Sequence, residues 1–524
     1  MRFSQARAYI LAFLLLLVVP LGIHWIHGSV ESRSPSAEDR LVIITPNDTD
    51  IRNEFKWAFS DWHLQKYGQR VDIEYLSPGG TSDIKRELET IYRKIETDHG
   101  GTLPAKDAIT VGIDMVWGGG DVFFDRELKP LGILAPIDLN AKTITQIFPQ
   151  PTLAGVKLYD QTKNESGNRL APQWVGTCLS SFGIVYNPDL YLTLHLAPPA
   201  TWSDLADPAL AGAVALADPT HSGTAGMTFM MVLQCAMGDA ENDFFAQPEN
   251  KSISKDTLRK TASYQVALDN GWKRGMAQLE LIAANARYFS DDARQSPSDV
   301  ASGDAAVGTA IDFYGRVTEE SVGPHRLQFV TPANATAVTP DPIAILYGAH
   351  GRQLELANHF IEFLLSPHGQ RLWILKAGQP GGPRLRALRR APIRRDAYHD
   401  QTGWTDNINY FTQTNGFTLR QEWMSTFSDL RTIWAAAWID SRDQLKDSYA
   451  KVLAVPDKIR RQHLLARLGD IPLTRQDVAD LMAVRKRIEA DPAQDADQWH
   501  ARERMNLSSR FRAHYRQVSL EAQR

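Results

Sequence analysis

Short apolar strands and amphipathic helices alternate along the chain from residue 41 onward. Residues 41–45, LVIIT, form a continuous apolar run that predicts a buried strand, and residues 51–62 repeat apolar side chains at every third or fourth position, as one face of a helix does. A second strand over 71–76 precedes a second helix over 84–95, and residues 111–115 alternate as a third strand. Strands that alternate with helices predict an α/β architecture with a largely parallel sheet.

Three polar loops follow these strands: PNDTD after the first, SPGGTSD after the second and WGGGD after the third. Ligands bind open parallel sheets in the crevice beyond the carboxyl ends of the strands, so the three loops are expected to converge on one crevice. The candidate ligand-binding residues in these loops are Asp48, Ser77, Gly79, Gly80, Thr81, Trp117, Gly118 and Gly119.

The turn SPGGTSD leads directly into a helix, whose start presents unpaired N–H groups and the positive end of a dipole. Thr81, Ser82 or Asp83 is expected to be the N-cap, and the two glycines allow another molecule to approach the backbone closely. These features predict a cradle for the polar end of a ligand. The alternative is an ordinary capped turn that binds nothing. No lysine follows the glycines, so the turn is not a nucleotide-binding P-loop.

The composition is that of a globular protein with two or more domains: 524 residues, 43% of them hydrophobic and 23% charged. The formal net charge is -4 and the isoelectric point is near 6.4. This balance gives no electrostatic reason to expect a nucleic-acid partner, which usually requires a basic patch. Small molecules or proteins are the expected partners.

The N-terminus has the pattern of an export signal, because Arg2 and Arg7 precede an uncharged apolar run over residues 8–23. The run is close to the lower limit of about 17 residues for spanning a bilayer, and no clear small-residue cleavage site follows it. We expect residues 1–33 to be an uncleaved anchor in the cytoplasmic membrane rather than a removed signal peptide. The rest of the chain is expected to be periplasmic or otherwise extracytoplasmic.

The chain has two cysteines, Cys178 and Cys235, and both lie in apolar surroundings typical of buried free thiols. One disulfide between them is possible in an oxidising compartment. No C-x-x-C pair and no zinc-binding spacing occurs.

The middle of the chain contains several ordered motifs: SSFGIVYNPDL from residue 180, TWSDLADPALAGAVALADPTHSGTAG from residue 201, and FLLSPHGQ from residue 363. Their order and spacing resemble the extracellular solute-binding proteins of ABC importers, in the group that includes ferric-ion, thiamine and phosphonate binders. The resemblance extends from about Leu41 to Ile393. Several motifs in order are more specific than one glycine loop.

The resemblance implies a two-lobed α/β fold of the periplasmic-binding-protein type II, with a ligand in the cleft and hinge closure of the lobes. The expected boundaries are 34–140 for the first part of lobe 1, 141–337 for lobe 2 and 338–400 for the return to lobe 1. Residues 401–524 have no counterpart in the family pattern and show apolar residues at helical spacing. This C-terminal extension is expected to pack on the lobes, and a module that docks a partner is the alternative.

Two ligand classes suit such a cleft. Ferric-binding relatives use adjacent tyrosines, and the corresponding stretch here contains Asp312, Phe313 and Tyr314, so only one phenol is present. Asp48, Asp312 and Tyr314 would form a poorer oxygen site for iron, or Asp312 and Tyr314 would only bond backbone groups. A polar or anionic metabolite fits better, since hydroxyls from both lobes and a tryptophan are available. The residues proposed for it are Ser77, Thr81, Ser222, Gly223 and Thr224, with Trp117 or Trp174 over an apolar part.

The function expected from the sequence is capture of a small solute for an ABC importer permease, by a monomer without cofactor or catalysis. The chain contains no H-E-x-x-H, G-x-S-x-G or Walker A motif, which leaves the common hydrolase and nucleotide-binding classes without support. A membrane-anchored sensor or assembly protein that reuses the same fold is the alternative, and the anchor and the extension are the features that favour it.

Overall fold

The computed structural model describes residues 39–164, 166–167, 169–412, 417–491 and 494–524. The expected membrane anchor at residues 1–33 lies outside this range. Among the described helices, none is long and apolar enough to span a bilayer.

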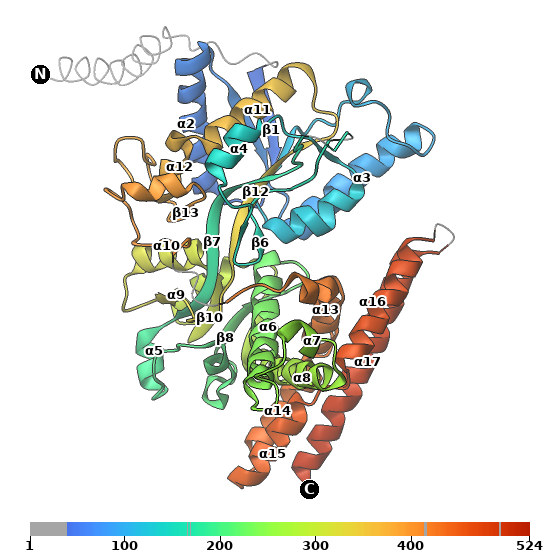
Figure 1. Cartoon of the computed structure of the whole chain (residues 1–524). Coiled ribbons are helices and arrows are strands. Elements are labelled where there is room, and N and C mark those ends of the chain that lie inside the picture. The colour runs from blue at the N-terminus through green and yellow to red at the C-terminus, as the bar shows by residue number, and fades with distance from the viewer. Residues whose placement is uncertain (1–38, 165, 168, 413–416, 492–493) are drawn as a thin grey trace, which may run out of the picture.

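The chain forms two α/β lobes that share one mixed sheet of 11 strands, in the order β2-β1-β3-β12-β7-β10-β8-β9 with β4, β11 and β13 at its sides. Figure 1 shows lobe 1 above, lobe 2 below, and strands β7 and β12 running between them. This arrangement confirms the predicted two-lobed fold with a helical C-terminal extension.

Lobe 1 is built on three parallel strands with helices on both faces, as the alternating pattern predicts. Gly68 ends the first of these helices in the left-handed conformation, at φ 75°. The third strand is shorter than expected, since only residues 115–117 pair. The elements of this lobe are β1 (Arg40–Ile44), α2 (Thr49–Tyr67), β2 (Asp72–Leu76), α3 (Thr81–Asp98), β3 (Met115–Trp117), β4 (Leu134–Ala135), α4 (Ala141–Ile147), β12 (Val338–Leu346), α11 (Gly351–Leu365), α12 (Pro367–Ile374) and β13 (Ala391–Pro392).

Lobe 2 is organised around a second set of parallel strands, β10-β8-β9, which β7 joins antiparallel. Two long helices, α6 and α8, pack against each other beside this sheet (Figure 1). The elements are β7 (Val175–Tyr186), α5 (Pro188–Thr193), β8 (Val214–Ala217), α6 (Gly223–Ala246), α7 (Lys255–Leu258), α8 (Ala262–Asn285), β9 (Ala286–Ser290), α9 (Gln295–Ser302), β10 (Val307–Ile311), α10 (Asp312–Val322) and β11 (Gln328–Val330), with the hairpin β5 (Thr152–Leu153) and β6 (Val156–Lys157) beside the crossing.

The chain crosses between the lobes later than the expected boundary at residue 141. Ile144, Phe148 and Tyr159 are buried in the apolar core of lobe 1, so the segment up to about residue 174 stays with that lobe, apart from Val156 of the β5–β6 hairpin, which joins the core of lobe 2. The crossing lies within β7, whose first half pairs with β12 and β13 and whose second half pairs with β10 and β11. An uninterrupted apolar strand gives no local signal for a boundary, which is why the sequence placed it too early.

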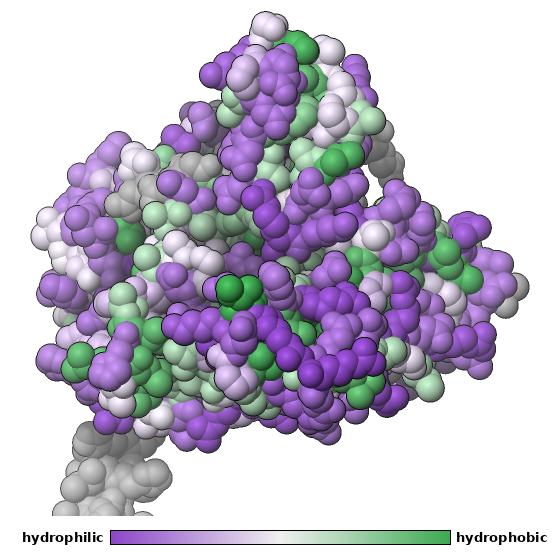
Figure 2. All heavy atoms as spheres, turned by 90° about the horizontal axis from the view of Figure 1, so that it is seen from below, coloured by the Kyte–Doolittle hydropathy of each residue, from purple (hydrophilic) through white to green (hydrophobic). Residues whose placement is uncertain are grey.

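The C-terminal extension first crosses lobe 1 and then packs on lobe 2. Ile408 and Tyr410 belong to the lobe 1 core, whereas the apolar residues from Leu419 onward join the core of lobe 2. The helices of the extension are α13 (Phe427–Trp434), α14 (Arg442–Leu453), α15 (Lys458–Gly469), α16 (Arg475–Glu489) and α17 (Ala496–Gln523). The face seen from below is mainly hydrophilic, with apolar side chains scattered in small groups (Figure 2). The extension therefore buries most of its apolar side chains against lobe 2, while Ile459, Met505 and Leu520 remain exposed.

Both cysteines are free thiols, so the disulfide considered from the sequence does not form. Cys178 is buried and Cys235 is half-buried. Burial raises the pKa of both thiols, which keeps them protonated and poorly reactive.

Candidate functional site

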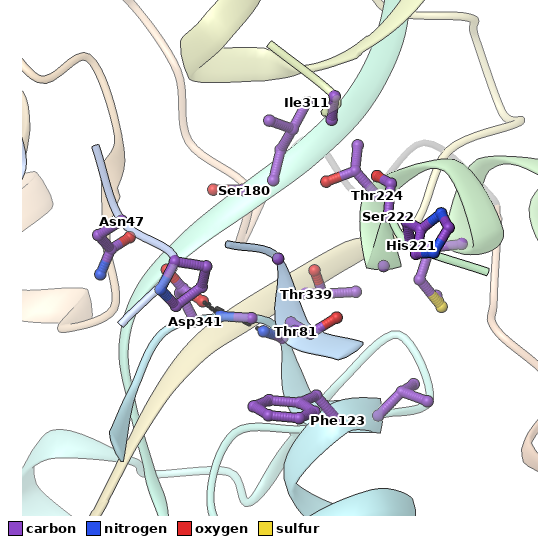
Figure 3. Close-up of a pocket in the computed structure, with 18 of the residues that line it drawn as sticks. Asn47, Thr81, Phe123, Ser180, His221, Ser222, Thr224, Ile311, Thr339 and Asp341 are labelled. Carbon is purple, nitrogen blue, oxygen red and sulfur yellow. Dashed lines mark hydrogen bonds between the residues drawn. The ribbon is translucent and has the colours of Figure 1, made fainter. Parts of the chain in front are cut away.

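A cavity of about 300 Å³ lies between the two lobes and is lined by loops from both of them. Its walls also include the crossing strands, where Ser180 of β7 pairs with Thr339 of β12. Thr81 of lobe 1 and Ser222, His221 and Thr224 of lobe 2 surround the same space (Figure 3). The volume is at the lower end of the range for small-molecule sites, which suits a compact metabolite.

The three loops predicted to converge do converge on this cavity. Ile44 pairs in parallel register with Leu76 and with Val116, so the carboxyl ends of β1, β2 and β3 lie at one edge. Each of the loops that follow contributes to the cavity wall, with the residues Pro46, Asn47, Gly79, Gly80, Thr81, Gly119 and Gly120.

Lobe 2 presents its own strand ends to the same cavity. Strands β8, β9 and β10 are parallel, and each is followed by residues that line the cavity. The predicted residues Ser222, Gly223, Thr224 and Tyr314 are among them. The residues after β9 that line the cavity were not among the predicted ones; they are Asp291, Asp292 and Arg294. Their signal was present in the stretch FSDDAR, a polar turn between a strand and a helix like the other turns.

Two helix starts, of α3 and α6, meet at the cavity wall. A Cβ atom built on Gly223 would lie 3.5 Å from the hydroxyl of Thr81, which shows how closely the two starts approach. In the described part of the chain, no protein atom accepts from the backbone N–H groups of Thr81, Ser82, Gly223 or Thr224. Unpaired N–H groups and two positive dipole ends together form an anion-binding environment.

The caps of these helices leave hydroxyl groups available. The Oγ of Ser222 accepts from the N–H of Ala225 at 3.2 Å, which leaves its own O–H free to donate. In α3 the N-cap is Gly80 rather than one of the expected residues, and the Asp83 carboxylate accepts from the N–H of Gly80 at 3.1 Å. Thr81 therefore starts the helix, with its hydroxyl at the cavity wall.

Charged side chains in the cavity wall are mostly paired. Arg294 donates to both carboxylate oxygens of Asp292, at 2.8 and 3.0 Å from Nε. Arg390 is buried and forms an ion pair with Asp341 at 2.7 Å. Because these guanidinium groups are neutralised by carboxylates, the helix starts are the main source of positive potential for a ligand.

Asp341 also holds the WGGGD loop in place. Its Oδ1 accepts from the N–H of Gly119 at 2.7 Å and from the N–H of Gly120 at 3.2 Å. A Cβ atom on Gly119, whose φ is 108°, would come within 2.5 Å of the Thr81 side chain. The loop amides therefore bind a carboxylate of β12, and the missing side chain allows β3 to approach α3.

Five of the predicted ligand residues lie outside the cavity wall: Asp48, Ser77, Trp117, Gly118 and Asp312. Trp117 is fully buried in the core of lobe 1, where its Nε1 donates to Thr177, and Asp48 caps α2 through the N–H of Ile51. Core packing therefore occupies the side chain of Trp117, and helix capping occupies one carboxylate oxygen of Asp48. Ser77 is exposed, and Gly118 lies against the side chain of Asn47.

Asp312 and Trp174 also have structural partners. Asp312 is buried and accepts from the N–H of Ser181 and the O–H of Tyr410, at 3.0 and 2.5 Å. Trp174 is buried and donates to Asp125 at 2.8 Å. The suggestion that Asp312 bonds neighbouring groups, rather than a ligand, matches this geometry.

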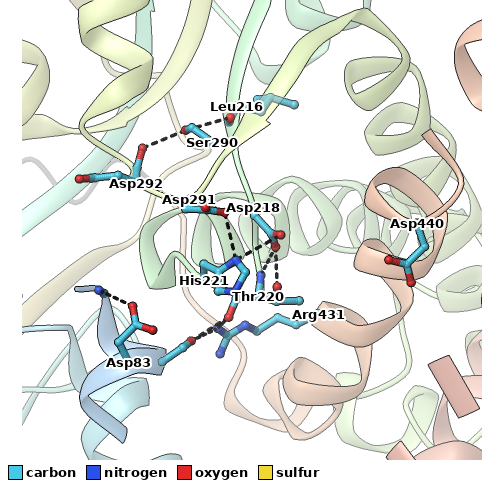
Figure 4. A network of polar contacts seen from close by, with 12 residues as sticks. Asp83, Leu216, Asp218, Thr220, His221, Ser290, Asp291, Asp292, Arg431 and Asp440 are labelled. Atoms are coloured by element: carbon cyan, nitrogen blue, oxygen red, sulfur yellow. Dashed lines mark hydrogen bonds and ion pairs between the residues drawn. The ribbon is translucent and has the colours of Figure 1, made fainter. Parts of the chain in front are cut away.

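Of the oxygen set considered for iron, Tyr314 lines the cavity, whereas Asp48 and Asp312 lie outside its wall. Burial raises the pKa of the Tyr314 phenol well above its usual value. One other group of the described residues has a geometry compatible with a metal: His221 Nδ1 lies 3.4 Å from Asp218 and 3.3 Å from Asp291 (Figure 4). Asp291 is 87% exposed, and the arrangement is equally that of a histidine between two carboxylates.

Asp121 is a buried carboxyl in the cavity wall. Burial, with a smaller contribution from Asp125, raises the pKa of Asp121 to about 7. The folded protein therefore keeps a proton on Asp121 that the unfolded chain, with an ordinary pKa of 3.8, releases at lower pH. The stability that this proton contributes is present at pH 4 and is lost as the pH rises to 7.

Replacing Asp121 with asparagine is expected to stabilise the protein at pH 8 by about 1 to 3 kcal/mol and to change little at pH 4, because only the ionised carboxyl is costly to bury. Melting temperatures of the parent and D121N across this pH range provide the measurement. Asp98→Asn, at an exposed position on α3, is the matched control. If the parent and D121N melt at the same temperature at pH 8, ionisation of Asp121 does not reduce the stability of the fold.

Comparisons with known proteins agree with this architecture. Residues 132–384 match the model of the family described as bacterial extracellular solute-binding protein. The phosphoglycerate transport regulatory protein PgtC of Salmonella typhimurium is 27% identical over 198 residues, which are 38% of this chain and 40% of PgtC. An uncharacterised protein of Haemophilus influenzae is 24% identical over 347 residues, 66% of this chain and 78% of that protein.

Among solved structures, the fold is similar to the periplasmic binding protein AfuA of Actinobacillus pleuropneumoniae with bound fructose-6-phosphate, at a TM-score of 0.50 and 19% identity. That similarity covers 76% of this chain and 98% of AfuA. The periplasmic binding protein P5PA gives the same TM-score at 16% identity. The chain thus has the fold of the periplasmic binding proteins, and the part of it that matches the solute-binding family model is residues 132–384.

Proposed function

We propose that this protein captures a small phosphorylated and hydroxylated solute outside the cytoplasmic membrane and delivers it to the permease of an ABC importer. The observation that carries the proposal is the pair of helix starts at Thr81 and Gly223, with four N–H groups that no described protein atom uses. A phosphate group accepts several such bonds at once, and helix dipoles favour its charge.

The rest of the cavity wall suits the neutral part of such a solute. Asp83, Asp291 and Asp292 line the cavity and have oxygens that accept hydrogen bonds from ligand hydroxyl groups. Phe123 and Phe427 add apolar surface. The names of two similar proteins point to the same chemistry, since PgtC is named for phosphoglycerate transport and AfuA holds fructose-6-phosphate.

A monomer that binds without catalysis, and an N-terminal segment that anchors it to the membrane, complete the proposal. The matched segment covers 40% of PgtC, so the partner permease and the solute are inferred from the site. Ferric ion, which the sequence left open, has less support, because Asp312 lies outside the cavity wall and bonds Ser181 and Tyr410.

The proposal predicts selective binding of phosphate monoesters. Calorimetric titration with 3-phosphoglycerate, fructose-6-phosphate, inorganic phosphate, spermidine and ferric citrate is expected to give saturable 1:1 binding for at least one ester and none for spermidine. Thr81→Val should weaken that binding roughly tenfold to a hundredfold, because a ligand oxygen loses a donor worth about 1 to 3 kcal/mol. Folding should not change, since Asp83 still bonds the N-cap. Binding of ferric citrate alone would overturn the proposal.

A ligand-sensing regulator is the second candidate function. The fold similarity to AfuA covers nearly all of AfuA but only 76% of this chain, and PgtC is named a regulatory protein. Purification of the full chain from membranes after crosslinking distinguishes the two functions: a co-purifying permease supports import, and a co-purifying histidine kinase or cyclase supports sensing.

A further inference from the structure

The C-terminal extension reaches the ligand cavity through helix α13. Phe427 and Arg431, one helical turn apart, both line the cavity. Leu430, Ile433 and Trp434 of the same helix are buried in the core of lobe 2. The helix is therefore fixed to lobe 2 while one of its faces closes the side of the cleft.

Arg431 contacts three separate parts of the molecule. Its Nε donates to the carbonyl of Pro219 at 2.5 Å and its Nη2 to the carbonyl of Thr220 at 2.9 Å, both in the turn after β8 of lobe 2. Across the cleft, Nη1 lies 2.9 Å from the carboxylate of Glu127, and Nη2 lies 3.3 Å from the hydroxyl of Ser82. Both of these acceptors belong to lobe 1.

The contact differs from an ordinary surface ion pair. The side chain of Arg431 is only 11% exposed and that of Glu127 only 19%, so neither charge is well hydrated in this arrangement. A guanidinium group with four acceptors in a fixed fork loses little further freedom when each bond forms. The bonds to lobe 2 are local and persist if the lobes separate, whereas those to Glu127 and Ser82 exist only when the cleft is closed.

Other contacts also cross the cleft beside this one. The hydroxyl of Ser82 donates to the carbonyl of Thr220 at 2.7 Å, and the backbone of Gly80 lies against the carbonyl of His221. Arg431 bonds both members of the first contact. Loss of the Arg431 side chain therefore removes the ion pair with Glu127 and also weakens the hydrogen bond between Ser82 and Thr220.

We infer that the C-terminal extension is the third wall of the ligand site and that Arg431 is a positioning residue that holds lobe 1 closed against lobe 2. In this role the extension raises the population of the closed state and slows escape of the solute. The part that concerns the solute rests on the proposed function, whereas the effect on closure is independent of any ligand.

The first test measures closure without a ligand. Spin labels attached through p-acetylphenylalanine at Thr97 of α3 and Val266 of α8 leave Cys178 and Cys235 unmodified and report the distance between the lobes. Both positions are exposed. Arg431→Met is expected to broaden the distance distribution and shift it from the parent value, and Glu127→Leu, from the opposite lobe, should have the same effect. The double variant should change the distance distribution no more than either single variant does, because both substitutions remove the same contact.

Arg475→Met is the matched control, because Arg475 of the extension pairs with Asp269 of lobe 2 at 2.7 Å and does not cross the cleft. It should leave the parent distribution unchanged. If R431M does not fold, as judged by circular dichroism, E127L decides the outcome. A parent-like distribution in R431M and E127L would overturn the inference, whatever the protein binds.

The second test measures retention of the solute. Stopped-flow dissociation of 3-phosphoglycerate or fructose-6-phosphate, whichever binds in calorimetry, should be about tenfold faster in R431M than in the parent and unchanged in R475M. If neither ester binds the parent, the proposed function fails while the label distances still decide the role of Arg431. Equal dissociation rates in R431M and the parent would contradict the retention role.

Discussion

Replacing Gly80 with leucine is expected to reduce solute affinity by more than a hundredfold. A Cβ atom at this position would lie 2.8 Å from the carbonyl oxygen of His221 in lobe 2, well inside ordinary contact distance. The larger side chain would also enter the space beside Thr81, where the phosphate is proposed to bind. Gly80 has an extended backbone, with φ -77°, so the effect comes from lost space between the lobes rather than from backbone strain.

Titration calorimetry and small-angle scattering of G80L measure this effect, and scattering should give a larger radius of gyration than in the parent. Gly238→Leu on α6 is the matched control, since nothing lies within 4 Å of a Cβ atom there. Parent-like affinity in G80L would show that the lobes do not meet at this turn when the solute is bound.

Replacing Trp438 with alanine is expected to destabilise lobe 2 by about 3 to 5 kcal/mol, the range for removing a large buried aromatic side chain. Trp438 is buried between the extension and lobe 2, stacks on Trp434 at 5.9 Å and meets Phe229 edge-on at 5.4 Å. Its Nε1 donates to Glu280 at 2.8 Å. Burial raises the pKa of Glu280 to about 7, so loss of this donor leaves a buried carboxyl with less support.

Denaturant unfolding monitored by circular dichroism gives the change in the free energy of unfolding. Trp499→Ala in α17 is the control, because that tryptophan is only half-buried and meets His500 of its own helix edge-on. If W438A unfolds at the same denaturant concentration as W499A, the extension does not share a core with lobe 2.

The sequence predicted the elements of lobe 1 because each of them carries its own signal. Apolar spacing located α2 and α3, and Gly68 marked the end of α2, where a left-handed residue was required. The crossing between lobes could not be located in the same way. Strand β7 is buried along its whole length, so the sequence pattern of its lobe 1 half does not differ from that of its lobe 2 half.

Loop residues of the candidate site were predictable where a strand, a turn and a helix start followed one another. Thr81, Ser222 and Thr224 were found by this pattern, and the turn after β9 would have been found by it too. Trp117 was misplaced because a tryptophan beside a glycine loop has the same local sequence whether it faces a ligand or the core.

Arg390 and Arg431 could not be predicted from local pattern. Arg390 follows β12 by more than 40 residues of chain and Arg431 lies in the extension, yet both reach the cleft through tertiary packing. A single arginine among other charged residues has no periodicity that marks it as buried. Only the arrangement of the lobes and the extension brings these side chains to the cavity.

The most direct test of the account is a crystal structure of the protein with 3-phosphoglycerate or fructose-6-phosphate, whichever binds more tightly in calorimetry. We expect the phosphate to lie between the starts of α3 and α6 and to accept hydrogen bonds from the N–H groups of Thr81 and Gly223. The hydroxyl groups of the solute should face Asp291 and Asp292. A phosphate bound elsewhere, with both helix starts unoccupied in the complex, would contradict the account.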